Sequence, residues 1–201
     1  MLEHILFFSI AVLSIVFHEV AHGLVAFWLG DSTAKDAGRL TVNPLKHVDL
    51  VGTILVPLAL RLMGISPLGW AKPVPVNFHN LRRPKRDMIF VAAAGPGINI
   101  LLAVLSAIMI NGLVGQRFVQ EALSYAVGIN LVLAIFNALP IPPLDGSKII
   151  MGMMPNQLAY HYAKWERFGI IIVLILLNVG LFEVIIAIAA VLARWMGINL
   201  I

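Results

Sequence analysis

The residues from Ile5 to Leu29 read ILFFSIAVLSIVFHEVAHGLVAFWL, and the ionisable side chains in this run are those of His18, Glu19 and His22. A membrane-spanning helix needs about 20 mostly apolar residues, so the run predicts such a helix. A charged group at mid-membrane costs about 2.5–3.5 kcal/mol on insertion scales. Three ionisable groups within five residues therefore indicate a functional site inside the span.

The composition extends this prediction to the whole chain of 201 residues. Hydrophobic residues make up 60% and charged residues 12%, whereas soluble domains carry about 45–50% apolar and about 25% charged residues. We therefore expect one membrane-embedded domain over residues 1–201, with the lipid bilayer as a partner. The net charge of +4 comes from basic residues that flank apolar runs, so nucleic acid is not expected as a partner. The chain has no cysteine, which leaves His, Asp and Glu as metal ligands.

Three further apolar runs are long enough to cross a membrane, namely Met88–Ile110, Ala122–Leu139 and Gly169–Ala193. The run Val51–Met63 is too short for a comfortable span, so a partial or re-entrant helix is expected there. The predicted fold class is thus an all-α polytopic membrane protein. It has about four full transmembrane helices and one short or re-entrant apolar segment.

Two polar connections are predicted to be extended. Arg39–Val42 is the best candidate strand, and Val74–Asn77 belongs to a segment punctuated by prolines. Short β-strands between the first spans therefore complete the predicted fold. Such strands pair with each other in the simpler interpretation, and with an extended substrate in the functional one.

The distribution of basic residues predicts the orientation. If the first span ends in the cytoplasm and 51–63 does not cross, eleven of the 14 basic residues lie inside. They are Lys35, Arg39, Lys46, Lys72, Arg82, Arg83, Lys85, Arg86, Lys148, Lys164 and Arg167. This asymmetry follows the positive-inside rule and puts both termini outside.

The sequence His18-Glu19-Val20-Ala21-His22 has the H-E-x-x-H pattern. Residues i and i+4 share a helical face, so both imidazoles can reach one metal ion. Zinc lowers the pKa of a bound water to about 7, and Glu19 is placed to accept its proton as general base. The alternative is a polar patch between helices or a proton relay.

Catalytic zinc usually has three protein ligands, so a third is expected at a similar depth. Asp145 follows the Ala122–Leu139 span, on the side where the first span ends, and is the best candidate. An ordinary Asp-Gly turn at Asp145 is the simpler alternative. Two other functions stay open: a membrane zincin with Glu166 as third ligand that cleaves peptides outside the bilayer, and a non-hydrolytic metal-binding membrane protein.

The chain resembles the site-2 protease family of intramembrane zinc metalloproteases. The resemblance rests on the H-E-x-x-H motif and on Asn137-Ala138-Leu139-Pro140-Ile141-Pro142-Pro143-Leu144-Asp145-Gly146. Residues 39–53 and 69–77, and Ala94-Gly95-Pro96-Gly97 with Asn99, are similar to the short bacterial and archaeal branch. The PDZ and CBS domains of some members are not seen.

The resemblance implies a zinc metalloendopeptidase that cleaves transmembrane segments of membrane proteins near the cytoplasmic face, as in regulated intramembrane proteolysis. It implies one Zn2+ per chain, held by His18, His22 and Asp145, with Glu19 as the catalytic residue. Asn137 would bind the substrate or the oxyanion, although an interhelical hydrogen bond is the alternative. The expected location is a prokaryotic cell membrane, with the active site toward the cytoplasm. Asn99 is expected to bond across helices, with a substrate contact as the alternative.

Overall fold

Helices dominate the computed structural model, which describes residues 2–62, 69, 71–112 and 117–200. Met63 and Trp70, which belong to segments considered above, lie outside the described residues. In chain order the elements are α1 (Leu2–Trp28), α2 (Thr33–Asp36), the 3-10 helix η1 (Pro44–His47), the π-helix η2 (Leu50–Leu55), α3 (Val56–Leu62), the 3-10 helix η3 (Phe78–Asn80), α4 (Pro84–Gly112), α5 (Arg117–Ala138), α6 (Asp145–Met153), α7 (Asn156–Ala163), α8 (Glu166–Asn178) and α9 (Leu181–Trp195).

Three of the described helices are long and apolar enough to cross a membrane: α1, α4 and α5. A fourth span is reached if α8 and α9 count as one. The segment at 51–62 is helical but short, formed by η2 and α3. This is the partial helix that the sequence predicts.

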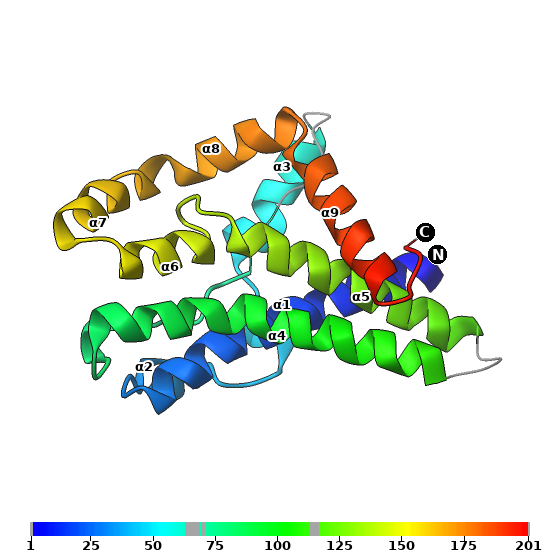
Figure 1. Ribbon diagram of the computed structural model, residues 1–201, viewed down its shortest axis with the longest axis horizontal. Helices are drawn as coiled ribbons and strands as arrows, with labels where there is room; N and C mark the ends of the chain where they lie inside the picture. Colours follow the sequence, from blue (N-terminus) through cyan, green and yellow to red (C-terminus); the bar gives the residue numbers. More distant parts are fainter. Residues whose placement is uncertain (1, 63–68, 70, 113–116, 201) are drawn as a thin grey trace.

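The predicted single span over Gly169–Ala193 is broken in the structure. Its two halves, α8 and α9, are bent by 73° at a short break. Gly180 has a φ of +101° there, a left-handed conformation that glycine adopts without steric cost. The bend turns α9 back onto α5 (Figure 1).

Helix α4 is the centre of the bundle, because it packs against α1, α5 and α6 (Figure 1). The core between α4, α5 and α9 contains many small side chains, including Ala103, Ala107, Ala189 and Ala193. Small residues let helix backbones approach closely, which is how helices associate in lipid.

The distribution of polarity is that of a multi-pass membrane protein. Large apolar side chains such as Phe8, Ile108 and Phe182 are exposed on the outside of the helices. Polar side chains such as Asn99 and Asn130 are buried, with exposed fractions of 0% and 2%. Polar groups within a membrane face the interior of the helix bundle in this way.

The predicted β-strands are wrong, since neither Arg39–Val42 nor Val74–Asn77 forms a strand in the described part of the chain. Pro73 and Pro75 lack an N–H group and cannot donate to a ladder. Three N–H groups in and beside this segment bond elsewhere. Lys72 N donates to the His47 carbonyl, while Val74 N and Asn77 N donate to carboxylates.

Candidate metal centre

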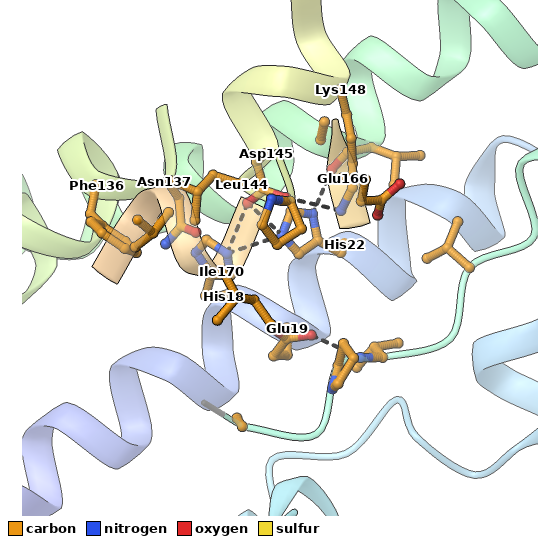
Figure 2. A pocket seen from close by; sticks show the side chains of 18 of the residues that line it. His18, Glu19, His22, Phe136, Asn137, Leu144, Asp145, Lys148, Glu166 and Ile170 are labelled. Atoms are coloured by element: carbon orange, nitrogen blue, oxygen red, sulfur yellow. Dashed lines mark hydrogen bonds and ion pairs between the residues drawn. The ribbon is translucent and has the colours of Figure 1, made fainter. Parts of the chain in front are cut away.

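Helix α1 presents His18 and His22 on one face, one turn apart, and both are buried. Their Nε2 atoms lie 3.0 Å from each other. Asp145 Oδ2 lies 3.1 Å from each of these nitrogens. Figure 2 shows the three side chains converging from α1 and from the start of α6.

Asp145 reaches this place because it is the first residue of α6, directly after the loop that follows α5. A carboxylate at a helix N-terminus is stabilised by the helix dipole. Burial raises the pKa of the Asp145 carboxyl, but its contacts with His18 and His22 and the charge of Lys148 lower that pKa by more. Asp145 is therefore a carboxylate at neutral pH.

The outer nitrogen of each imidazole also has a partner. His22 Nδ1 lies 2.7 Å from the Val91 carbonyl oxygen, which can only accept, so the nitrogen donates. His18 Nδ1 lies 2.6 Å from Asn99 Oδ1. Partners of this kind fix the tautomer and the ring orientation of metal-binding histidines, and they leave both Nε2 lone pairs free to bind a cation.

This arrangement fits a zinc ion. Three electron-pair donors lie within 3.1 Å of one another, and they would repel each other unless a cation lay between them. Ligand atoms around tetrahedral zinc, with bonds of about 2.0–2.1 Å, lie about 3.3 Å apart. Imidazole nitrogen with a carboxylate oxygen is also a donor set of catalytic zinc sites.

Gly95 of α4 borders the same point. A Cβ atom at this position would lie 2.4 Å from His22 Nε2 and 2.5 Å from His18 Nε2. The space beside both nitrogens therefore exists because this residue has no side chain.

Glu19 lines the cavity that contains the two histidines and Asp145, and this cavity has a volume of about 700 Å³. Its Oε2 accepts a hydrogen bond of 2.8 Å from the backbone N–H of Val74. Figure 2 shows its carboxylate turned toward the extended segment that carries this amide. We call residues 71–77 the strap.

Asp31, just beyond the end of α1, anchors the strap. Its side chain is fully buried and accepts hydrogen bonds from Asn77 N at 2.7 Å and from Asn80 Nδ2 at 3.0 Å. Thr33 donates to it through N and Oγ1. Burial raises the pKa of Asp31, but these hydrogen bonds lower it by more. A buried carboxylate thus ties the strap to the helix that carries Glu19.

The structure brings together His18, Glu19, His22 and Asp145 at one cavity, as the sequence predicts. Their roles in metal binding and catalysis remain predictions. Asn137 also lines the cavity, and its Nδ2 donates to the Leu133 carbonyl on its own helix rather than across helices.

Glu166 lines the cavity too, but it is not part of the metal-binding group found among the described residues. That group consists of His18, His22 and Asp145. Sequence reasoning missed the contact of Asn99 with His18, the role of Asp31, and the Lys148 ammonium at 3.6 Å from Asp145 Oδ1. The i,i+3 spacing of Asp145 and Lys148 was the one signal for the last of these.

Known proteins match parts of this chain. The family model of Peptidase family M50 matches residues 114–180. This is the family of the site-2 proteases, which the chain resembles. The matched segment contains Asp145 and Asn137, while the histidine motif lies outside it.

Two curated proteins are similar to this chain. The Bacillus subtilis (strain 168) protein named "Putative zinc metalloprotease YwhC" is 44% identical over 94 residues, which are 47% of this chain and 40% of the relative. The Mycolicibacterium smegmatis protein named "Putative zinc metalloprotease Rip2" is 33% identical over 94 residues, which are 46% of this chain and 35% of the relative. The matches therefore span less than half of each relative. No solved structure gives a significant match.

Proposed function

We propose that the protein is an intramembrane zinc metalloprotease that hydrolyses peptide bonds in transmembrane segments of membrane proteins. One observation carries this proposal. His18 Nε2, His22 Nε2 and Asp145 Oδ2 lie within 3.1 Å of one another, and α1, which carries the two histidines and Glu19, is apolar and long enough to span a membrane.

The donor set supports zinc as the metal. The names of the two relatives, each a "Putative zinc metalloprotease", support it as well. His18, His22 and Asp145 would hold the ion. When bound, zinc supplies Lewis-acid chemistry, because it polarises a carbonyl oxygen and lowers the pKa of water to about 7. Three protein ligands are the usual set of a catalytic zinc site, in which water or substrate takes the remaining position.

Glu19 supplies the proton transfer. The Val74 N–H holds Oε2 at 2.8 Å, and we assign Oε1 as the atom that takes the proton of the attacking water. Glu19 then delivers this proton to the leaving amine nitrogen. The Asn137 side chain is assigned to the oxyanion, since it lines the same cavity.

The cavity supports an apolar substrate segment. Apolar side chains form most of its lining, among them Val56, Phe78, Phe136, Ile170, Val173 and Leu174. The substrate segment has to be locally unwound, because a helix hydrogen-bonds its own carbonyl groups. The strap offers an extended backbone beside Glu19.

We further propose that the active site opens toward the cytoplasm. Figure 1 shows α2, the start of α4 and α7 at one end of the bundle, with both termini at the other. Lys35 in α2, Lys85 and Arg86 at the start of α4, and Lys164 after α7 belong to the first end. The positive-inside rule assigns such an end to the cytoplasm.

Reconstitution tests the function. The purified protein and a library of single-span substrates are placed in liposomes with zinc, and products are identified by mass spectrometry. We expect cleavage within an apolar segment, near its cytoplasmic end. Glu19→Gln protein should keep bound zinc and lose cleavage by at least about a hundredfold, since positioned acid–base catalysis contributes about 10²–10⁴-fold.

The alternatives predict other products. Cleavage of water-soluble peptides alone would contradict an intramembrane substrate. A Glu19→Gln protein with unchanged cleavage would overturn the mechanism. Asn178→Leu is the matched control, because Asn178 lies in α8 and its side chain donates to the carbonyl of Leu174 in the same helix.

A further inference from the structure

Three buried polar side chains form a chain of hydrogen bonds behind the metal centre. Ser14 of α1, Asn99 of α4 and Asn130 of α5 have exposed fractions of 3%, 0% and 2%. None of them is among the residues that line the cavity around Glu19. They therefore lie outside the cavity in which we place the substrate, and their place in an apolar bundle requires another explanation.

The first link fixes the orientation of the Asn130 amide. Its Nδ2 lies 2.9 Å from the Ala126 carbonyl oxygen and 2.9 Å from Ser14 Oγ. The opposite orientation would place the amide oxygen against a carbonyl, where both atoms are acceptors. The nitrogen of Asn130 therefore faces Ala126, and its oxygen faces Asn99.

The second link fixes Asn99. Because Asn130 Oδ1 is an acceptor, the Asn99 atom 2.7 Å away must be the donor Nδ2. The same nitrogen lies 3.4 Å from the Ser14 carbonyl oxygen, which agrees with this orientation. Asn99 Oδ1 is then turned toward α1, where it lies 2.6 Å from His18 Nδ1.

The third link fixes the histidine. An amide oxygen only accepts, so His18 Nδ1 carries the proton and Nε2 keeps its lone pair. We propose that Asn99 and Asn130 are positioning residues that hold His18 in the Nδ1–H tautomer, with Nε2 presented to the metal. The Ala126 carbonyl sets the orientation of the Asn130 amide, and Asn130 sets that of the Asn99 amide. Asn99 in turn sets the tautomer of His18. This inference rests on the proposed function.

The arrangement suits a membrane interior. In His22 the same task is performed by a backbone carbonyl, that of Val91. A carboxylate partner for His18 would add a second negative charge to the buried site that contains Asp145. A neutral amide supplies the acceptor without that charge, and burying a charge in an apolar environment is costly.

Zinc affinity tests the inference. The full-length protein in detergent is titrated against a zinc chelator, and folding is checked by thermal unfolding. Loss of the outer hydrogen-bond partner of a metal-binding histidine costs about 10–100-fold in metal affinity. The zinc affinity of Asn99→Leu should therefore fall by this factor. Asn99→Asp keeps an oxygen acceptor and should restore affinity to within about tenfold of the unsubstituted protein.

Two further variants complete the set. Asn130→Leu removes the anchor of Asn99 without touching His18, and should weaken zinc less than Asn99→Leu does. Asn178→Leu makes the same substitution on α8, where the side chain donates to the Leu174 carbonyl of its own helix, and should leave zinc affinity unchanged. Equal affinity in the Asn99→Leu and unsubstituted proteins would overturn the inference, as would equal losses in Asn99→Leu and Asn99→Asp.

A second readout observes the histidine itself in the unsubstituted protein. In the zinc-loaded protein labelled with ¹⁵N histidine, and assigned with His18→Ala, the His18 signal should show a proton on Nδ1 and the metal on Nε2. A proton on Nε2 would overturn the inference. If zinc binding instead survives His18→Ala, the metal centre of the proposed function fails as well, so the two failures are distinguishable.

Discussion

The backbone N–H of Val74 donates a hydrogen bond of 2.8 Å to Glu19 Oε2. The donor belongs to the strap and the acceptor to α1, 55 residues earlier in the chain. Prolines on both sides of Val74 restrict the backbone there and remove competing donors. The strap thus holds the carboxylate that we assign as the general base.

Removal of this one donor is expected to slow catalysis. Val74→Pro removes the N–H, whereas Val74→Ala keeps it and removes only the buried side chain. A hydrogen bond to a charged group contributes about 1.5–3 kcal/mol, so kcat should fall about tenfold or more in Val74→Pro. Zinc content should be unchanged in both variants. Equal kcat values for the two would show that the hydrogen bond does not position Glu19.

A side chain at position 95 is expected to block the metal site. In Gly95→Ala the new Cβ would lie within 2.5 Å of His18 Nε2 and His22 Nε2. Both imidazoles are held from behind by hydrogen bonds and cannot retreat freely. We expect the variant to fold but to lose bound zinc, as measured by elemental analysis.

Gly97 provides the control for that experiment. It lies in the same helix, and a Cβ there would meet nothing within 4 Å. Gly97→Ala should therefore retain zinc, with a stability equal to or up to about 1 kcal/mol above that of the parent. Zinc loss in both variants would contradict the steric explanation.

The Asp31 carboxylate is expected to contribute to stability in a pH-dependent way. Its pKa in the folded protein is lower than the ordinary value of 3.8, so the carboxylate stabilises the fold above that pH. This stabilisation is lost as the pH falls below 3.8 through the folded-state pKa. Asp31→Asn places an amide N–H against the Asn77 donor and should cost about 1–3 kcal/mol at neutral pH.

Thermal unfolding in detergent measures this effect. The difference in the free energy of unfolding between Asp31→Asn and the parent should be largest at pH 7 and should shrink as the pH falls below about 4. Ser32→Ala, which alters an exposed neighbour that bonds to Asp36, should show no such dependence. A difference that is constant from pH 7 to pH 3 would contradict the assignment of a buried carboxylate.

The sequence predicted the parts of the site that depend on helical spacing and on length. His18 and His22 are four residues apart in an apolar run, so one helical face had to carry both. The position of Asp145 followed from the end of the preceding span. The spacing of these residues along the chain was therefore sufficient to predict that they lie together.

The remainder depends on tertiary contacts that sequence periodicity does not contain. The bond from Val74 to Glu19 and the hold of Asp31 on the strap join segments far apart in the chain. The same two bonds help to explain why Val74–Asn77 forms no strand, since the N–H groups of Val74 and Asn77 donate to carboxylates. The bend at Gly180 was missed because the residues on both sides are equally apolar.

We propose that His18, His22 and Asp145 hold the zinc ion. Zinc X-ray absorption of the purified protein, recorded beside the zinc contents of Asp145→Ala and Glu166→Ala, tests this assignment. We expect one zinc per chain with two imidazole ligands and oxygen in the remaining positions, loss of zinc in Asp145→Ala, and an unchanged zinc content in Glu166→Ala. Zinc that persists in Asp145→Ala and disappears in Glu166→Ala would contradict it.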